Sequence, residues 1–368
     1  MLALLLPFNK VLVRRLVPLF PPRDATSESR LRVLKMKQVL TAEAAMARAI
    51  ECARLGLGKT FPNPIVGAVI TSATGEFISD GFHQGADHAE VVALKKAGSA
   101  ARGATMVVSL EPCAHTGSTP PCTQAIIDAG ITKVIYAITD PNPIATGGAK
   151  LLADAGIAVE HQPSAPLEFM QRAWLTKQSL GRPLMIWKVA MTLDSKVAAS
   201  DGTSQWISGP ESREDVQLLR AQSDAILIGT NTALVDNPHL IPRGHEARPV
   251  RIVCGEQVVP PTHNVFDDQA RTITVKSKSI PELLKVLSDE GFNQVLVEAG
   301  PTLGSALMAT GNIDELVIYQ APKLLGAGKE FVSHLGISTL ADHIGLELIS
   351  VEQFGSDAKS HYRIVKGR

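Results

Sequence analysis

The sequence is poor in features that would tie it to nucleic acid or to a membrane. Its 36 basic and 36 acidic residues cancel, so the chain as a whole has no net attraction to polyanions or anionic lipid. Aromatic residues make up 4% of the chain, too few for a platform that stacks nucleobases. The apolar residues are dispersed and form no run long enough to span a bilayer. We therefore expect neither nucleic acid nor a membrane among its partners.

Cysteine is also scarce. The chain contains four cysteines, which is too few for a disulfide framework and typical of a protein in a reducing compartment. We accordingly predict a cytoplasmic location. The 368 residues, of which 45% are hydrophobic, suffice for two domains of roughly 150 residues, each with its own core.

Residues 1–35 differ in composition from the rest of the chain. They begin with an apolar stretch that Pro7 interrupts, and their arginines make the segment basic. A signal peptide would carry positive charges before the apolar stretch, whereas an Arg-rich transit peptide fits the composition. An extension upstream of a start at Met36 fits as well, and we favour it because a helix pattern follows directly. We predict that residues 1–35 are not part of the fold and that two domains cover residues 36–181 and 182–368.

One short segment combines a histidine, a glutamate and two cysteines in an order that predicts a zinc site. His88 and Glu90 belong to a His-x-Glu triplet, Cys113 follows a proline, and Cys122 comes one loop later. Zinc prefers tetrahedral nitrogen and sulfur ligands, and a catalytic zinc keeps its fourth position for water. This order is typical of zinc-dependent deaminases of nucleobases, in which the glutamate shuttles the proton. We predict one zinc per chain, held by His88, Cys113 and Cys122, with Glu90 as the catalytic residue.

Two alternatives remain open for this segment. The loop between the two cysteines, residues 114–121, is longer than the usual Cys-x-x-Cys spacing, and the cysteines could be core residues, as free cysteines often are. His115, within the loop, could replace His88 as a ligand, although lining the pocket or facing solvent is the simpler role.

The first domain shows alternating helix and strand patterns. Thr41 precedes apolar residues at helical spacing, so we predict that it caps a helix that ends at Gly56. Predicted strands cover residues 65–70, 77–79, 104–110 and 133–138, and predicted helices cover residues 88–97, 120–129 and 168–180. Such alternation favours a largely parallel sheet with helices on its faces. Ligand sites in such sheets lie at the carboxyl ends of the strands, where the zinc-ligand candidates fall.

A second alternating pattern begins after Pro183 and contains no metal motif. Its predicted strands cover residues 185–189, 224–229, 250–254, 272–275 and 294–297, and its predicted helices cover residues 211–221 and 281–290. The turn from Glu298 to Gly304 opens a further helix, and backbone N–H groups at such a start bind phosphates, although an ordinary strand-to-helix turn is an equal alternative. Four charged residues could serve an anionic substrate, although isolated surface charges are common: Lys188, Asp194, Arg220 and Arg243.

The motifs of both halves resemble those of the bifunctional deaminase–reductase family of riboflavin biosynthesis, from residue 36 to about residue 328. In the first half the resemblance is carried by Pro62-Asn63-Pro64-Ile65-Val66-Gly67, His88-Ala89-Glu90, Leu110-Glu111-Pro112-Cys113, Thr119-Pro120-Pro121-Cys122 and Asp140-Pro141-Asn142-Pro143. In the second half it is carried by Lys188-Val189-Ala190-Met191-Thr192-Leu193-Asp194, Ser204-Gln205-Trp206-Ile207, Asp224-Ala225-Ile226-Leu227-Ile228-Gly229 and Glu298-Ala299-Gly300-Pro301-Thr302-Leu303. The long loop between the two cysteines is a feature of this family.

The resemblance implies a cytidine-deaminase-like three-layer α/β domain followed by a dihydrofolate-reductase-like α/β domain. The first would use zinc to hydrolyse the ring amino group of a diaminopyrimidinone ribosylamine phosphate. The second would use NADPH to reduce the ribosyl group to a ribityl chain. The partner is then a small phosphorylated pyrimidine, and we further expect a homo-oligomer.

The resemblance also assigns individual residues. Cofactor positions are matched by Ala190, Trp206, Thr232, Asp236, Gly300, Pro301, Thr302, Leu303, Gly304, Ser305 and Ala306. Substrate positions are matched by Asn63, Lys188, Asp194, Ser204, Arg220, Leu240, Arg243 and Glu298.

Two residues depart from the family's pattern. Ser118 stands where a basic residue is usual and would suit the substrate phosphate, and Ser195 stands where glycine is usual. A weakened deaminase site would leave only one of the two activities. An alternative from another class is a zinc-binding module that senses a nucleotide without catalysis.

Overall fold

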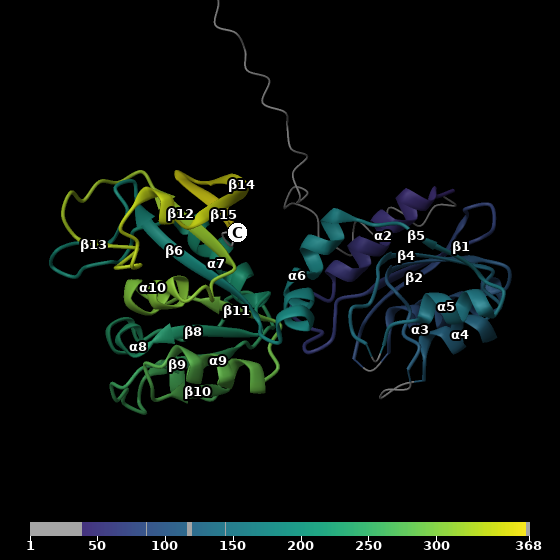
Figure 1. Cartoon of the computed structure of the whole chain (residues 1–368), viewed down its shortest axis with the longest axis horizontal. Coiled ribbons are helices and arrows are strands. Elements are labelled where there is room, and N and C mark those ends of the chain that lie inside the picture. The colour runs from purple at the N-terminus through teal and green to yellow at the C-terminus, as the bar shows by residue number, and fades with distance from the viewer. Residues whose placement is uncertain (1–38, 86, 116–119, 144, 366–368) are drawn as a thin grey trace, which may run out of the picture.

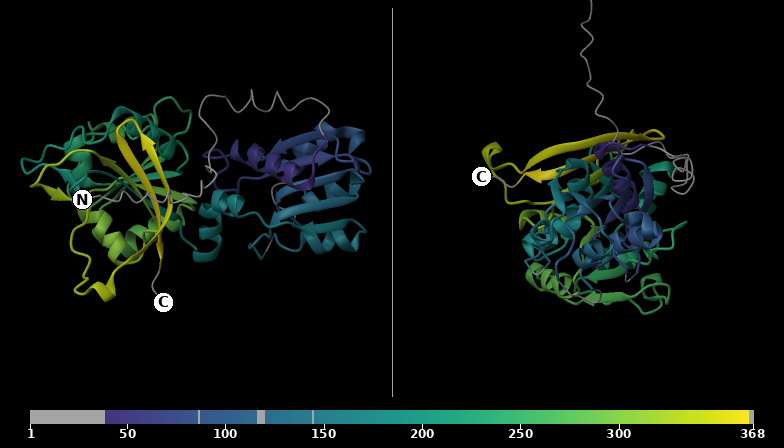
Figure 2. Two further views of the ribbon diagram at one scale, coloured as in Figure 1. Left: turned by 90° about the horizontal axis from the view of Figure 1, so that it is seen from above. Right: turned by 90° about the vertical axis from the view of Figure 1, so that its right-hand side faces the viewer.

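The computed structural model describes residues 39–85, 87–115, 120–143 and 145–365 and places them in two α/β units side by side (Figures 1 and 2). Helix α6 (Ala165–Leu180) lies between the units. The predicted extension over residues 1–35 and the departure at Ser118 fall outside the described residues. Within the described residues, no helix combines the length and the apolar character needed to cross a membrane.

The first unit is built on a five-stranded sheet with the strand order β2-β1-β3-β4-β5. Its strands are β1 (Gly67–Thr71), β2 (Phe77–Phe82), β3 (Thr105–Leu110), β4 (Lys133–Ile138) and β5 (Ala158–His161). Its helices are α2 (Ala42–Arg54), α3 (Ala89–Ala97), α4 (Cys122–Asp128) and α5 (Gly148–Asp154). Thr41 caps α2 as predicted, because its side-chain oxygen accepts a hydrogen bond from the backbone N–H of Ala44.

Two strand glycines let helices approach both faces of this sheet. A Cβ atom on Gly67 would lie 2.0 Å from the carbonyl oxygen of Ala49 in α2. A Cβ atom on Gly81 would lie 2.5 Å from the carbonyl oxygen of Ala89 in α3. Gly81 pairs with Ala68, the neighbour of Gly67, so the two glycines face opposite sides. The unit therefore has three layers, with the sheet between α2 and α3.

The prediction of a largely parallel sheet is wrong for half of the strand pairs in this unit. Strand β1 runs antiparallel to both β2 and β3, while β3, β4 and β5 are parallel to one another. The turn at Gly75, with a φ of 86°, reverses the chain between β1 and β2. Helix α3 then carries the chain back to the start of β3, which is therefore parallel to β2 and antiparallel to β1.

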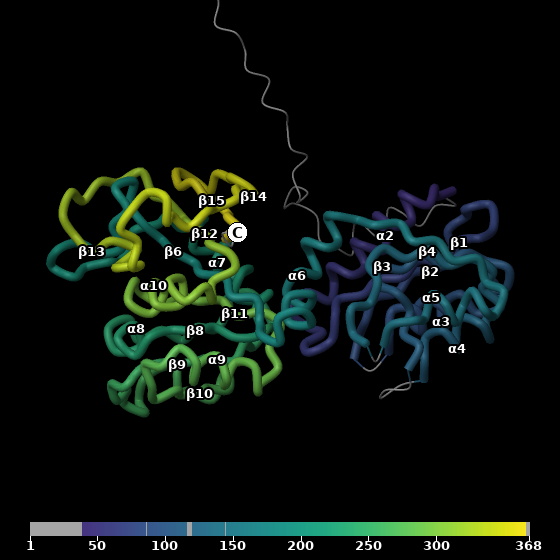
Figure 3. The backbone as a smooth tube through the Cα atoms, in the orientation of Figure 1, coloured from purple at the N-terminus to yellow at the C-terminus, as the bar shows by residue number. Residues whose placement is uncertain are grey.

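The second unit is built on an eight-stranded sheet with the order β10-β9-β8-β11-β6-β12-β15-β14. Its strands are β6 (Leu184–Thr192), β8 (Ala225–Gly229), β9 (Val250–Cys254), β10 (Thr272–Val275), β11 (Gln294–Val297), β12 (Glu315–Ala321), β14 (Gly345–Phe354) and β15 (Asp357–Val365), and a separate small sheet pairs β7 (Lys196–Ala198) with β13 (Lys329–Glu330). Its α-helices are α7 (Pro210–Ala221), α8 (Thr230–Asp236), α9 (Ile280–Asp289) and α10 (Pro301–Ala309). Neighbours from β10 to β12 are parallel, and β12, β15 and β14 are antiparallel. Figure 3 traces the backbone through this unit.

Strands β12, β14 and β15 have no counterpart among the predicted elements. Exposed and half-buried residues predominate along β14 and β15, so the apolar pattern of a buried strand is missing there. Two cores nevertheless enclose the large sheet: Leu283 and Leu307 bring α9 and α10 into one, and Val216 and Ala233 bring α7 and α8 into the other.

The units are joined by apolar and ionic contacts around α6 and the turn at residues 60–64. Leu167 and Trp174 of α6 pack into the core of the first unit. The ring of Phe61 lies 5.7 Å from that of Phe292, centroid to centroid. The neighbouring Asn293 side chain donates a hydrogen bond to the carbonyl oxygen of Pro62 at 3.2 Å. The predicted boundary between residues 181 and 182 falls between α6 and β6 and stays a prediction.

Candidate functional sites

The three predicted zinc ligands meet where helices begin and a strand ends. His88 is the N-cap of α3, Cys113 follows β3, and Cys122 is the first residue of α4. Their nitrogen and sulfur atoms all lie within 4.8 Å of one another. His88 Nδ1 is 3.1 Å from Cys122 Sγ and 3.7 Å from Cys113 Sγ. Three donors from separate elements thus converge on one point.

The chemistry of this donor set fits zinc. One imidazole nitrogen and two sulfurs are ligands that zinc favours, and three of them leave a fourth tetrahedral position open. Hydrogen bonds from Cys122 and His88 lower the pKa of the Cys113 thiol, which favours the thiolate that binds metal. Within the described part of the chain, no other set of three such residues has this geometry, and His115 does not belong to it. His88 is therefore the histidine that accompanies the two cysteines.

Glu90 lies beside these ligands in the first turn of α3. Its side chain is buried, with 4% of the residue exposed. Burial raises the pKa of its carboxyl group, and the carboxyl group contacts the Cys122 side chain. A carboxyl group with a raised pKa at the edge of an N/S donor set can both accept and return a proton.

Two further residues support this site and were not predicted as functional. Glu111 is buried, and its carboxylate accepts hydrogen bonds from the backbone N–H groups of Asp140 (3.1 Å), Gly147 (3.2 Å) and Ala149 (3.0 Å). It thereby ties the loop before α5 to the segment that carries Cys113. The Leu110-Glu111-Pro112-Cys113 motif contained this residue, but a buried acid that binds only backbone gives no separate signal in sequence.

His83 is the second of these residues. Its ring lies 5.4 Å from that of His88, centroid to centroid, and its Nε2 is 3.4 Å from the side-chain nitrogen of Asn63. Burial, followed by the proximity of His88, lowers the pKa of His83. Asn63, a predicted substrate position, thus contacts His83, whose ring lies near that of the candidate zinc ligand His88. Asn63 belongs to the turn that also contacts the second unit.

The second unit contains a cavity of about 1740 Å³ at the ends of its parallel strands. Twelve of the residues predicted for this unit line it: Lys188, Ala190, Ser204, Trp206, Arg220, Thr232, Asp236, Leu240, Arg243, Glu298, Gly300 and Pro301. The segments that supply them are far apart in the sequence, and the fold brings them to one space.

Three of these residues form a partly buried ionic group. Arg220 donates to both oxygens of Glu298, at 2.6 and 2.9 Å, and the ammonium nitrogen of Lys188 is 3.0 Å from Glu298 Oε2. Burial alone would raise the pKa of Glu298, but Arg220 and Lys188 outweigh it and hold that pKa well below its usual range. The two predicted cations are therefore not free charges, because they share one carboxylate. One positive charge is left over for an anionic ligand.

The remaining predicted residues do not line the cavity. Asp194 accepts hydrogen bonds from Thr192 (2.6 Å) and from the backbone N–H of Gly326 (2.7 Å), so its carboxylate holds two loops together. Ser195, the second departure, has a φ of 64°, in the region that favours glycine. Within α10, the residues that follow Pro301 also lie away from the cavity lining: Thr302, Leu303, Gly304, Ser305 and Ala306.

The two glycines at the start of α10 have different surroundings. Gly300 lines the cavity, and a Cβ atom there would meet nothing within 4 Å. A Cβ atom on Gly304 would lie 2.1 Å from the ring of Trp187, so Gly304 lets α10 pack on β6. The start of α10 at Gly300 and Pro301 therefore borders an open space that can admit a phosphate, which fits a nucleotide cofactor.

Two models of known families match this chain. The description "cytidine and deoxycytidylate deaminase zinc-binding region" matches residues 40–138, and "RibD C-terminal domain" matches residues 183–360. The first range contains all three candidate zinc ligands. The second contains all the residues that line the cavity.

Relatives and solved structures span nearly the whole chain. The riboflavin biosynthesis protein RibD of Mycobacterium tuberculosis is 42% identical over 337 residues, covering 88% of this chain and 98% of the relative. RibD of Escherichia coli is 39% identical over 358 residues, covering 86% and 97%. A crystal form of Acinetobacter baumannii RibD superposes with a TM-score of 0.81 at 34% identity, covering 88% of this chain and 99% of that one. A Thermotoga maritima diaminohydroxyphosphoribosylaminopyrimidine deaminase/5-amino-6-(5-phosphoribosylamino)uracil reductase does so with a TM-score of 0.81 at 32% identity.

Proposed function

Since this chain belongs to the RibD family of riboflavin biosynthesis, we propose a substrate and a role for the residues of each site. The matches confirm the predicted family and the predicted order of a deaminase-like domain and a reductase domain. The chain is thus a bifunctional enzyme, a zinc-dependent deaminase joined to an NADPH-dependent reductase.

The proposed substrate of the first domain is diaminohydroxyphosphoribosylaminopyrimidine, and that of the second is 5-amino-6-(5-phosphoribosylamino)uracil. These are the compounds in the name of the Thermotoga maritima relative. The observation that carries the proposal is the convergence of His88, Cys113 and Cys122 beside a buried carboxyl group, with all ligand atoms within 4.8 Å.

In the deaminase site, His88, Cys113 and Cys122 would hold the metal, and Glu90 would accept and return the protons. When bound at these ligands, zinc would supply Lewis-acid activation of a water molecule. Glu90 accepts a proton from that water while the water oxygen forms a bond to the amino-bearing ring carbon. It then returns a proton to the amino group, which leaves as ammonia when its bond to carbon breaks. Asn63, next to His83, is placed to bind the substrate.

In the reductase site, NADPH supplies the hydride, and the chain supplies position and charge. The N-terminal N–H groups of α10, beside Gly300 and Pro301, are proposed to bind a cofactor phosphate. Lys188, Arg220 and Glu298 also line the site and present one net positive charge with hydrogen-bonding capacity to the phosphorylated substrate. The remaining cavity-lining residues named above keep their predicted cofactor and substrate roles as part of this proposal.

One assay tests the proposal. The purified protein is incubated with the diaminopyrimidine phosphate, with and without NADPH, and the product masses are measured. We expect the deaminated product without NADPH and the deaminated, reduced product with it. Zinc retention without ammonia release would contradict the deaminase and favour a nucleotide-sensing module. Deamination without reduction, or reduction of separately supplied deaminated compound without any deamination, would leave a single activity.

We further propose a cytoplasmic homo-oligomer. Support comes from β14, an edge strand of the large sheet, on which Leu346, Leu348 and Val351 are 45%, 55% and 59% exposed. An edge with exposed apolar residues favours pairing with another chain. Light scattering after gel filtration measures the mass. A dimer or larger species that Leu348→Lys dissociates would support the proposal, and a monomeric wild-type protein would contradict it.

A further inference from the structure

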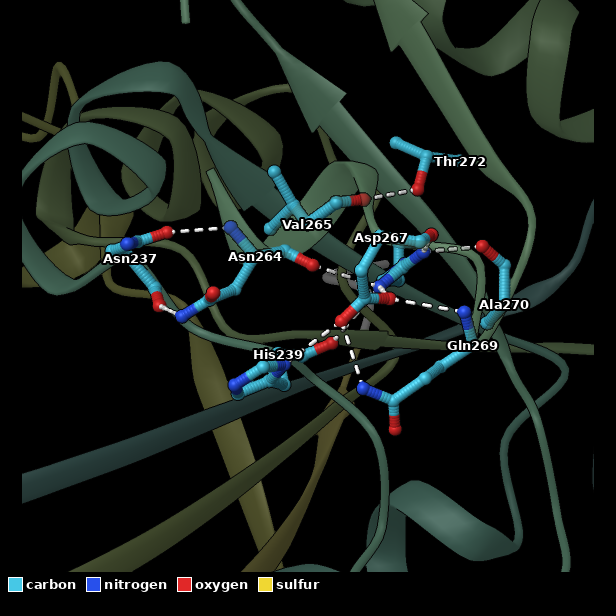
Figure 4. Close-up of polar contacts among 9 residues, drawn as sticks. Asn237, His239, Asn264, Val265, Asp267, Gln269, Ala270 and Thr272 are labelled. Carbon is cyan, nitrogen blue, oxygen red and sulfur yellow. Dashed lines mark hydrogen bonds and ion pairs between the residues drawn. The ribbon is translucent and has the colours of Figure 1, made fainter. Parts of the chain in front are cut away.

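Residues 237–243 form a loop of the reductase cavity. This loop is bonded to a segment that a buried arginine holds in place, and neither proposed reaction uses this arginine. Arg251 lies in β9 with none of its surface exposed. Its guanidinium donates to Asp267 Oδ1 at 2.7 Å and to the carbonyl oxygens of Asn264 at 3.1 Å and Asp267 at 2.6 Å, and also to that of Ala270. One side chain thus gathers the segment from Asn264 to Ala270. Figure 4 shows Asn264, Asp267 and Ala270 of this segment.

The gathered segment is bonded in turn to the start of the cavity loop. The side chain of Asn237 accepts a hydrogen bond from the backbone N–H of Asn264 at 2.7 Å, and the side chain of Asn264 donates to the carbonyl oxygen of Asn237 at 2.7 Å. Asp267 Oδ2 lies 2.9 Å from Nδ1 of His239. Figure 4 shows Asn237 beside Asn264, and His239 below Asn264 and Asp267. Two residues of the loop are therefore tied to the cluster.

Two residues of the loop have a left-handed backbone conformation. Asn237 and Leu240 have φ angles of 41° and 58°, in the left-handed region that non-glycine residues seldom adopt. Leu240 is nevertheless buried, with 2% exposed, and lines the cavity. The far end is fixed by Gln217, whose side-chain oxygen accepts a hydrogen bond from the backbone N–H of Arg243 at 3.1 Å. Residues keep such a conformation where several surrounding contacts hold the backbone in it.

We propose that Arg251, Asn264 and Asp267 are positioning residues of the reductase. They hold residues 237–243 in the conformation that presents Leu240 and Arg243 to the phosphorylated substrate. This inference rests on the proposed function, because Leu240 and Arg243 are assigned there to the substrate and not to the cofactor. The cluster makes no contact with the turn at the start of α10 among the hydrogen bonds of the described residues, so cofactor binding should not depend on it.

The test uses two single changes in the full-length enzyme, Asn264→Ala and Asp267→Asn. Each weakens the link to the loop and leaves Arg251 in place. We expect the KM for the reductase substrate to rise about three- to tenfold, the range for loss of one hydrogen bond, with kcat and NADPH affinity unchanged. The matched control is Arg271→Ala, which removes the bidentate pair of Arg271 with Glu290, at 2.6 Å for both bonds, from the same domain. It should leave the KM at the wild-type value.

Hydrogen exchange provides a readout that does not depend on the substrate. The amides of residues 237–243 should exchange faster in Asn264→Ala and Asp267→Asn than in the wild type, and at the wild-type rate in Arg271→Ala. Unchanged exchange and an unchanged KM in folded variants would overturn the inference, as would an equal loss of NADPH affinity. Wild-type enzyme that does not reduce the substrate would contradict the proposed function instead, and the exchange comparison would then decide on the positioning role.

Discussion

The two candidate sites are built from very different lengths of chain. The metal site takes its four residues from the stretch between His88 and Cys122, and each lies at or beside the end of an element of one small sheet. The reductase cavity draws its lining from Trp187 to Phe331, across most of the second unit. A compact site depends on a few elements that neighbour one another in sequence. A wide site depends on the packing of the whole domain, so changes remote from the ligand can alter it.

The sharpest way to separate the two sites is to remove a metal ligand. Cys113→Ala takes away one of three donors, so we expect loss of the bound zinc and of all measurable deamination, with reduction of an already deaminated substrate intact. Elemental analysis and separate assays of the two reactions measure this. The control is Cys52→Ala, which replaces a buried cysteine outside the site. It is a closer match than Ser109→Ala, a change near the end of the strand that precedes Cys113. Stoichiometric zinc in Cys113→Ala would contradict the ligand assignment.

Replacing Glu90, which lies beside the candidate metal ligands, should slow the reaction and leave zinc binding unchanged. Glu90→Gln keeps the shape of the side chain but cannot carry the proton, so deamination should fall by about 10²- to 10⁴-fold while zinc stays bound. Ammonia release and zinc content are measured on the same preparation. Ammonia release near the wild-type rate would show that another group moves the proton.

The junction between the domains should respond to acid. Glu315 in β12 is bonded to Arg172 of α6 at 2.5 and 3.0 Å and to His361 of β15 at 2.8 Å. Burial alone would raise the pKa of Glu315, but Arg172 and His361 outweigh it and lower the pKa to about 2. Its ordinary value is about 4.3, so the stabilisation is present above that pH and is lost as the pH falls towards the folded value.

That loss amounts to up to about 3 kcal/mol of unfolding free energy by linkage. Thermal unfolding followed from pH 5 downwards measures it, with Glu315→Gln as the variant in which this part of the pH dependence should flatten. Arg271→Ala, which breaks an exposed ion pair, is the control. An identical pH profile in wild type and Glu315→Gln would show that this ionic contact does not stabilise the junction.

The smallest expected effect concerns the start of α10. Gly300→Val places a side chain in the open space of the cavity, so NADPH affinity should fall about tenfold, or roughly 1.4 kcal/mol, with the melting temperature unchanged. Gly304→Val is the matched variant: its side chain would collide with Trp187, which should cost about 1–3 kcal/mol of stability. NADPH titration and thermal unfolding of both variants distinguish the roles. Unchanged affinity in Gly300→Val would remove this turn from the cofactor site.

The sequence predicted most helices and strands of the first unit and the parallel part of the second, because their apolar periods and caps are local. It did not predict β12, β14 and β15. The pattern of β14 and β15 is largely that of exposed and half-buried residues, and their partners lie far away in the chain. The predicted strand directions in the first unit were also wrong in part, because an apolar strand has the same sequence pattern in a parallel and in an antiparallel pair.

The candidate zinc ligands could be predicted from the sequence, because His88, Cys113 and Cys122 lie in short connected elements that end near one another, and the structure brings these three residues together. The charge of the reductase cavity was decided only by the tertiary structure. Lys188 and Arg220 read as free cations in the sequence, but the fold brings Glu298, 78 positions after Arg220, between them. Asp194 read as a substrate contact, and the fold uses its carboxylate to hold the backbone at Gly326. The physical reason is range: a side chain's charge and hydrogen bonds are set by its neighbours in space, and in this domain those neighbours are distant in sequence.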